Sequence, residues 1–122
     1  MSSGEPAVLI VEDEKPLAEL FEMWLAESCD VQVATSGRDA LEALHHELDV
    51  VVLDWRMPQV PGEKILERIH EKGMTTAVLV VTGFEPEFDE IDYQVDASLI
   101  KPVTSNELRS VVTNLAAKHA IE

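Results

Sequence analysis

Side chains that could do chemistry follow the apolar runs of this chain at four places. Glu12 and Asp13 come after the first run, Asp54 after the third, Thr82 after the fourth and Lys101 after the last. If these runs are strands of an open parallel sheet, their carboxyl ends lie along the edge where ligands bind. We therefore expect carboxylates, a hydroxyl and an ammonium to converge on one rim of the protein.

Carboxylates held close together repel one another and cannot all stay ionised unless a cation neutralises them. Hard oxygen ligands suit Mg²⁺, which typically takes one or two protein carboxylates and leaves positions for a phosphate. A phosphoryl group on Asp54 would then lie between the metal and the ammonium of Lys101, with Thr82 donating a hydrogen bond. The residues therefore predict a magnesium-dependent phosphoryl site.

An acid-rich chain also places carboxylates after strands by chance, and we interpret Glu14 and Asp49 in that way. Asp54 differs because it ends the fully apolar run 50–53 and precedes a turn-rich segment. Trp55, which follows it, is expected either to line the mouth of the pocket or to be an exposed loop aromatic without a special role.

The spacing of apolar residues predicts the elements that must position this rim. Runs of about five apolar residues alternate with segments of helical period, which is the pattern of a parallel sheet built from strand and helix units. Strands are predicted at residues 7–11, 31–34, 50–53, 77–81 and 98–100. Helices are predicted from Pro16 onward, at 38–47, at 63–71, and after a cap at Thr104 or Ser105. Residues 84–96 fit either helical or alternating spacing, and their carboxylates and Pro86 favour a short or irregular helix.

Length and composition are those of one domain, with a tail at residues 1–6 and a folded unit at 7–120. No apolar run approaches the roughly 18 to 20 residues of a membrane span, and no basic region precedes the first run as in a secretory signal. The lone Cys29 excludes an internal disulfide. We expect a cytoplasmic protein that does not bind membranes.

The chain carries 24 acidic against 9 basic residues, a net charge of −15. Such a charge repels a phosphate backbone, so direct nucleic-acid binding is not expected. The acidic excess also resembles that of proteins adapted to high salt, which indicates a halophilic source. The four histidines, His45 and His46 on one predicted helix and His70 and His119 on two others, are expected to be solvated helix surface.

Four motifs, in this order and on these strand ends, resemble the receiver domain of two-component response regulators over nearly the whole chain. They are Leu9-Ile-Val-Glu-Asp13, Leu53-Asp54 with Met57-Pro58 and Gly62, Val81-Thr82-Gly83, and Lys101-Pro102. The resemblance implies an α/β fold of the flavodoxin-like, doubly wound type. Its parallel sheet would have five strands in the order 2-1-3-4-5 and helices on both faces, the fourth helix being short or irregular.

The resemblance also implies roles for individual residues. Asp54 matches the phospho-acceptor and a metal ligand, Asp13 a direct metal ligand, and Glu12 the acid that holds a metal-bound water. Arg56 matches the position whose backbone carbonyl binds the metal.

Two further positions, Thr82 and Lys101, match the switch hydroxyl and the lysine that contact the phosphoryl group. Mg²⁺ is the implied cofactor, a sensor histidine kinase or phosphotransfer protein the implied donor, and a downstream protein or output domain the implied recipient of the signal. The implied chemistry is limited to the domain's own phosphorylation and dephosphorylation, so an enzyme is not expected.

Two departures from the family pattern concern the conformational readout. Ser98 stands three places before Lys101, where many receivers have an aromatic residue, and the interval from Thr82 to Lys101 is about one helical turn shorter than in common members. The usual inward swing of an aromatic ring is therefore not available. We expect residues 84–96 to carry the change instead.

Two other functions are alternatives to a phosphorylated receiver domain. An aspartyl-nucleophile phosphatase or phosphotransferase needs a second acid just after the nucleophile to protonate the leaving group, and Trp55 and Arg56 occupy those places. A phosphorylation-independent interaction module is the stronger alternative because Ser98 departs from the switch pattern.

Overall fold

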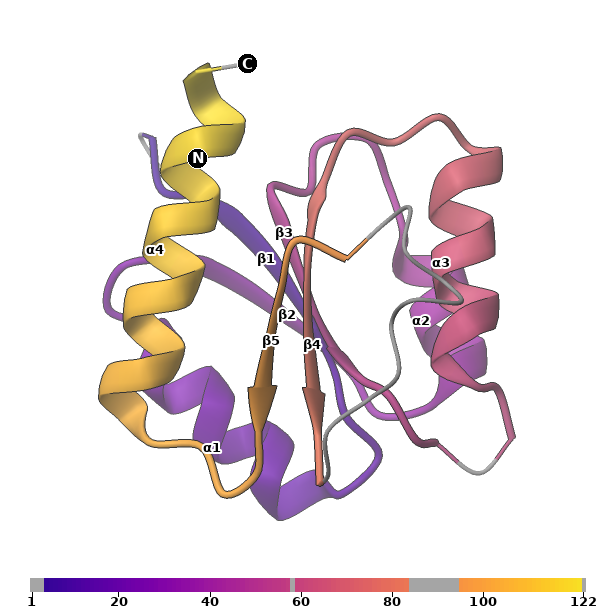
Figure 1. The fold of residues 1–122 in the computed structure, drawn as a ribbon, viewed down its shortest axis with the longest axis horizontal. Helices are drawn as coiled ribbons and strands as arrows, with labels where there is room; N and C mark the ends of the chain where they lie inside the picture. Colours follow the sequence, from indigo (N-terminus) through magenta and orange to yellow (C-terminus); the bar gives the residue numbers. More distant parts are fainter. Residues whose placement is uncertain (1–3, 58, 84–94, 122) are drawn as a thin grey trace.

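Five apolar runs form one parallel sheet between two layers of helices in the computed structural model, which describes residues 4–57, 59–83 and 95–121 (Figure 1). The strands are β1 (Ala7–Val11), β2 (Asp30–Ala34), β3 (Val50–Asp54), β4 (Ala77–Thr82) and β5 (Ala97–Ile100). The helices are α1 (Lys15–Leu25), α2 (Gly37–Ala43), α3 (Gly62–Glu71) and α4 (Ser105–Ile121). The sheet order is β2-β1-β3-β4-β5 with every pair parallel, so the predicted doubly wound topology is confirmed.

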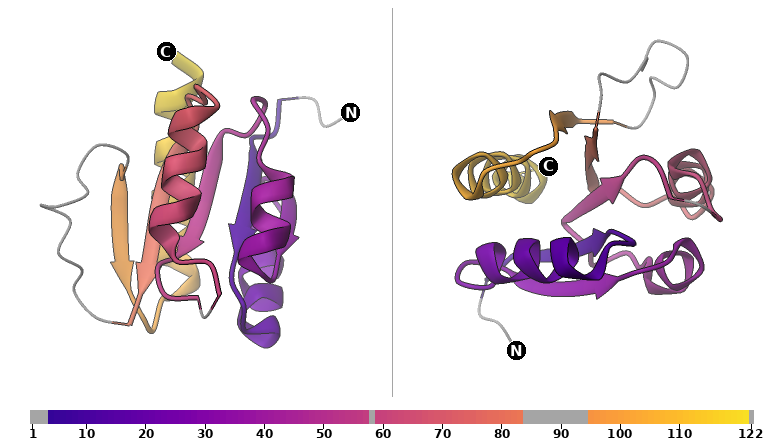
Figure 2. Two further views of the ribbon diagram at one scale, coloured as in Figure 1. Left: turned by 90° about the vertical axis from the view of Figure 1, so that its right-hand side faces the viewer. Right: turned by 90° about the horizontal axis from the view of Figure 1, so that it is seen from below.

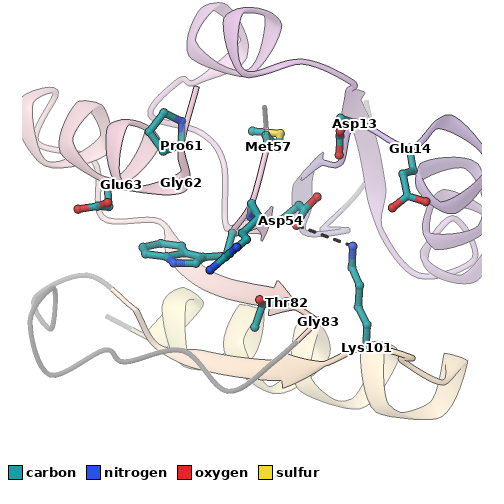
Figure 3. Close-up of a pocket in the computed structure, with 12 residues that line it drawn as sticks. Asp13, Glu14, Asp54, Met57, Pro61, Gly62, Glu63, Thr82, Gly83 and Lys101 are labelled. Atoms are coloured by element: carbon teal, nitrogen blue, oxygen red, sulfur yellow. Dashed lines mark hydrogen bonds and ion pairs between the residues drawn. The ribbon is translucent and has the colours of Figure 1, made fainter. Parts of the chain in front are cut away.

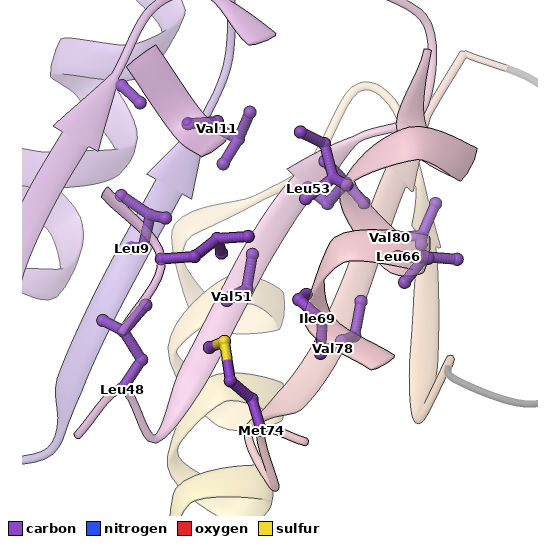
Figure 4. Packing of buried hydrophobic residues seen from close by; sticks show 14 of the residues in the cluster. Leu9, Val11, Leu48, Val51, Leu53, Leu66, Ile69, Met74, Val78 and Val80 are labelled. Carbon is purple, nitrogen blue, oxygen red and sulfur yellow. The ribbon is translucent and has the colours of Figure 1, made fainter. Parts of the chain in front are cut away.

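The helices cover the sheet in two pairs, α2 and α3 on one face and α1 and α4 on the other (Figure 2). Successive residues of a strand point to opposite faces, and this divides the core in two. In β3, Val51 and Leu53 join the cluster under α2 and α3 (Figure 4). Val50 and Val52 join the cluster under α1 and α4. A central strand covered on both faces is expected to be apolar throughout, as residues 50–53 are.

The predicted α1 stripe and the predicted α4 cap are both present. Phe21 and Leu25 are buried, and Trp24 packs beside Phe21 with its ring centroid 5.7 Å away. At the start of α4 the Thr104 hydroxyl accepts the Glu107 N–H at 3.1 Å, while the Glu107 carboxylate accepts the Thr104 N–H at 3.0 Å. This reciprocal capping box fixes Thr104 as the N-cap.

Among the described helices, none has the length and apolar content to cross a bilayer.

Helix α2 is shorter than predicted, because it ends at Ala43 and not at residue 47. Leu44 is extended, with ψ of 127°, and a turn follows in which His45 Nδ1 and the His45 carbonyl accept the N–H groups of Glu47 and Leu48 at 3.2 Å. Leu44 and Leu48 are both buried, and the chain must reverse between them to begin β3. His45 is therefore in a turn, and its placement on a helix was wrong; His46 lies in the same turn.

At the amino ends of the strands, the prediction of solvated surface was also wrong for His119. Asp49 Oδ1 lies 2.8 Å from His119 Nδ1, and Asp49 Oδ2 accepts the Ala7 N–H at 2.8 Å. The other ring nitrogen of His119 lies 3.3 Å from the Thr75 hydroxyl, and the His119 side chain is 17% exposed. Asp49 thus joins the end of α4 to the start of β1 and, through His119, to the turn before β4, so its interpretation as a carboxylate placed by chance was wrong.

Candidate functional site

The site residues meet because of the strand register. Val11 of β1 pairs with Leu53 of β3, so the next residues, Glu12 and Asp54, lie side by side at the carboxyl ends of these strands. Asp54 in turn pairs with Val81 of β4, the residue before Thr82. Thr82 pairs with Ile100 of β5, the residue before Lys101. Three adjacent ladders therefore deliver the predicted groups to one edge of the sheet, as expected for a doubly wound fold.

These groups line an open pocket of about 800 Å³ at the carboxyl ends of the strands (Figure 3). Its wall includes Asp13, Glu14, Asp54, Trp55, Arg56, Met57, Pro61, Gly62, Glu63, Thr82, Gly83 and Lys101. Glu12 lies deeper, with 1% of its surface exposed, and contacts Lys101. The structure thus brings together all six residues that the sequence singled out. Glu14, which was interpreted as a carboxylate that follows a strand by chance, also lines the pocket and is exposed.

The ammonium of Lys101 is shared by two carboxylates. Its Nζ lies 3.2 Å from Glu12 Oε1 and 3.8 Å from Asp54 Oδ1. Burial acts to lower the pKa of Lys101, but the negative charges of Glu12 and Asp54 outweigh burial and raise it. Lys101 is therefore a fixed positive charge at the floor of the pocket.

Asp54 is 5% exposed, and its pKa is raised from 3.8 to about 7, mainly because burial disfavours the charged form. The negative charge of Glu12 also acts to raise the pKa, whereas Lys101 and the Arg56 N–H, which donates to Asp54 Oδ1 at 3.3 Å, act to lower it. The dominant cause is desolvation of the charged form, strengthened by a like charge nearby. The carboxyl groups that line the pocket outnumber its two cationic side chains, Lys101 and Arg56.

The residues present fit a hard divalent cation. Glu12, Asp13 and Asp54 each offer a carboxylate oxygen, and these three atoms lie within 4.8 Å of one another. Oxygen ligands grouped in this way suit Mg²⁺. A bound cation would also remove the repulsion that raises the pKa of Asp54.

Two buried oxygens at the site make no hydrogen bond within the described protein. One is Glu12 Oε1, which has the Lys101 ammonium at 3.2 Å but not in hydrogen-bonding geometry. The other is the hydroxyl of Thr82, whose residue is 1% exposed. A buried hydroxyl without a partner costs about 1–3 kcal/mol, which indicates that a ligand satisfies it at some stage of function.

Trp55 lines the pocket and is half-buried, which confirms the prediction that it lies at the pocket and not on an exposed loop. Its backbone N–H donates to the Val81 carbonyl at 3.1 Å, and its backbone carbonyl accepts the Gly62 N–H at 3.3 Å.

Ser98 lies exposed on β5. Residues 84–94, most of the segment predicted to carry the readout and to form the fourth helix, lie outside the described part of the chain.

Comparison with known proteins agrees with this architecture. The family model described as the response regulator receiver domain matches residues 8–113. A Haloferax volcanii protein provisionally named a transcriptional regulator is 38% identical over 121 residues, which are 98% of this chain and 21% of that protein. The response regulator ArlR of Staphylococcus aureus is 33% identical over 106 residues, 83% of this chain and 48% of ArlR. The chain therefore spans less than half the length of either relative.

Solved structures show the same fold. The receiver domain of the Francisella response regulator 1452 superposes with a TM-score of 0.80 at 28% identity, covering 93% of this chain and 98% of that one. A signal receiver domain from Vibrio parahaemolyticus gives a TM-score of 0.88 over 96% of this chain and 94% of its own, at 24% identity.

Proposed function

This chain belongs to the family of response regulator receiver domains, and on that premise we propose that it accepts a phosphoryl group on Asp54 in a Mg²⁺-dependent reaction. The observation that carries the proposal is the buried Thr82 hydroxyl, which has no partner among the described residues and lines the same pocket as Asp54 and Lys101. A tetrahedral anion on Asp54 would supply the missing acceptor for Thr82 and a partner for the ammonium of Lys101.

In the proposed reaction a carboxylate oxygen of Asp54 attacks the phosphorus of a phosphohistidine. The new O–P bond forms as the N–P bond of the donor breaks, and the donor imidazole keeps the bonding electron pair. The donor would be a sensor histidine kinase or a phosphotransfer protein. Glu12, Asp13, Asp54 and the carbonyl of Arg56 would hold Mg²⁺, which supplies positive charge against the phosphoryl oxygens.

The attacking group must be ionised, and the pKa of Asp54 near 7 leaves part of it protonated at neutral pH. Bringing a cation within reach of the three carboxylates would favour the ionised form. Lys101 would then leave Glu12 for the phosphoryl oxygens, and Thr82 would donate its hydroxyl proton to one of them. Each of these side chains thus has a partner in the phosphorylated protein.

The proposal limits the chemistry to the domain itself. Asp54 is followed by Trp55 and Arg56, neither of which can protonate a leaving group as a hydrolase acting on other substrates requires. Its signal would pass to a downstream protein or an output domain. A phosphorylation-independent interaction module remains the second candidate, favoured by Ser98 in the place of the usual aromatic residue.

The experiment is phosphorylation with acetyl phosphate and MgCl₂, followed by intact mass. One added phosphoryl group is expected in the wild type and in Asp39→Asn, which alters an exposed carboxylate on α2. No addition is expected in Asp54→Asn, and labelling of that variant would show that the acceptor lies elsewhere. A wild type that is labelled neither by acetyl phosphate nor by a phosphorylated donor protein would favour the phosphorylation-independent module.

The metal ligands are tested separately by Mg²⁺ titration. Asp13→Ala is expected to weaken binding strongly because it removes one of the three converging oxygens. Glu14→Ala is the matched control, since Glu14 lines the pocket but is not one of those three residues. Equal loss in both variants would mean that general acidity, and not a defined ligand set, attracts the cation.

A halophilic source is proposed from charge and similarity together. A net charge of −15 and 38% identity to a Haloferax volcanii protein both point to a salt-rich source. We also propose that the protein works in the cytoplasm, where ATP-dependent kinases supply phosphohistidine.

A further inference from the structure

The loop between β3 and α3 is described at residues 55–57 and 59–61, and two of its side chains pack directly against glycines. Val60 packs on Gly37, the first residue of α2, and Trp55 packs on Gly62, the first residue of α3. The two contacts hold the loop from opposite ends and join it to two different helices. Both glycines are buried.

Neither glycine is required by the shape of the backbone. The only positive φ angles among the described residues belong to Gly4 and Gly73. At the first position of a helix, alanine would otherwise be favoured over glycine. The reason for glycine at 37 and 62 must therefore be the space that its missing side chain leaves.

At Gly37 this space is filled by Val60. A β-carbon added to Gly37 would lie 2.7 Å from Val60 Cγ2 and 3.0 Å from Cγ1, and it would overlap Val60 Cβ outright. Rotation of the valine side chain cannot relieve the overlap, because Cβ is bonded directly to the backbone. The backbone of the loop would have to move.

At Gly62 the space is filled by the indole of Trp55. An added β-carbon would lie 2.6 Å from Trp55 Cε3 and 3.1 Å from the Trp55 carbonyl oxygen. That carbonyl accepts the Gly62 N–H at 3.3 Å, so the two ends of the loop are joined to each other. Because the loop is closed in this way, a displacement at Val60 is passed toward Trp55 and its neighbour Arg56.

Arg56 is the residue through which the loop reaches the site. Its N–H donates to Asp54 Oδ1 at 3.3 Å, and its carbonyl belongs to the proposed metal ligands. We propose that Gly37 and Gly62 are positioning residues, which set the affinity for Mg²⁺ by admitting Val60 and Trp55 and so fixing the backbone at Arg56. This inference rests on the proposed Mg²⁺ site.

The test measures the Mg²⁺ dissociation constant by isothermal titration calorimetry at constant KCl. Gly37→Ala is expected to weaken binding about tenfold or more, as for other residues that orient metal ligands. Ala40→Gly is the matched control: it weakens the same short helix at a buried position without pushing on Val60. Its dissociation constant should stay within twofold of the wild type.

Rescue separates the Val60 contact from a general effect on α2. Adding Val60→Gly to Gly37→Ala removes the three side-chain carbons of Val60 that the new alanine Cβ would meet, and this double variant should regain most of the affinity. Adding Val60→Ala should not, because alanine retains the overlapping Cβ. If Gly37→Ala does not fold, Val60→Gly alone is informative, since it removes the contact without overlap and should weaken binding several-fold.

Any of four results would overturn the inference. The affinity of Gly37→Ala for Mg²⁺ could stay within twofold of the wild type, or Ala40→Gly could lose as much affinity as Gly37→Ala. Glycine and alanine at position 60 could restore the affinity of Gly37→Ala equally, or Val60→Gly alone could bind Mg²⁺ as the wild type does. In each case wild-type Mg²⁺ binding would leave the proposed function standing. A wild type that binds no Mg²⁺ would refute the proposed metal site and the inference together.

Discussion

Replacing Asp54 by asparagine should stabilise the folded domain above neutral pH, although it removes the proposed phospho-acceptor. The pKa of Asp54 is 3.8 in an ordinary environment and about 7 in the folded protein, where burial and then Glu12 disfavour its charge. Between these two values the unfolded chain has released the proton and the folded protein still holds it. The free energy of unfolding must therefore fall as pH rises through that window.

The size of the effect follows from the same two values. One pKa unit corresponds to about 1.4 kcal/mol, so the ionised carboxylate costs the folded state up to about 4 kcal/mol above pH 7. Water in the open pocket reduces this, and we expect on the order of 3 kcal/mol. That is a large part of the roughly 5–15 kcal/mol that holds such a domain together. Below about pH 4 the carboxyl is protonated in both states and the cost disappears.

The assay is urea unfolding of the wild type and Asp54→Asn from pH 4.5 to 8.5, at constant KCl and with chelator present. The other carboxylates titrate in both proteins, so the difference between them isolates Asp54. It should grow in favour of the variant up to about pH 7 and then level off. A difference that does not change with pH would show that Asp54 is ionised throughout the range and that burial does not set its pKa.

Two further predictions concern stability away from the pocket. His119→Ala should lower the free energy of unfolding by about 1–2 kcal/mol because it removes the partner of Asp49 Oδ1 and of the Thr75 hydroxyl. Lys118→Ala, an exposed change in the same turn, should have an effect below about 0.5 kcal/mol, and equal effects would refute a specific role for His119. The melting temperature should rise between low and molar KCl as salt screens the net charge of −15, and a flat profile would count against salt adaptation.

The strands of the sheet and the residues at their carboxyl ends could be predicted because both depend on the types of residues that are close together in the sequence. Residues 50–53 are apolar without interruption since β3 is covered on both faces, and Asp54 is the first polar residue of that strand. The same reasoning placed Thr82 and Lys101 at the ends of the neighbouring strands. The order of parallel strands then brings these ends together, whatever the loops between them do.

The errors arise where a distant contact decides the structure. The helical spacing of α2 continues to residue 47, but the chain leaves the helix after Ala43 because it must return to the start of β3 at Val50. His119 and Asp49 are 70 positions apart, so no periodicity links them. The contact of Val60 with Gly37 is equally hidden, because a glycine at the start of a helix has no local signature of the side chain that fills its place.

The distribution of charge around the pocket indicates where a conformational response must begin. Phosphorylation would replace the single negative charge of Asp54 by about two, and the ammonium of Lys101, now 3.2 Å from Glu12, would be drawn toward it. The hydroxyl of Thr82, which has no partner among the described residues, gains an acceptor in the same event. Lys101 follows β5 and Thr82 ends β4, which pair with each other at one side of the sheet, whereas no residue of β2 lines the pocket. Both groups with a reason to move are thus attached to the β4–β5 side. We therefore expect the response to start there and to reach α4 through the short connection after Lys101, leaving β1 and β2 in place.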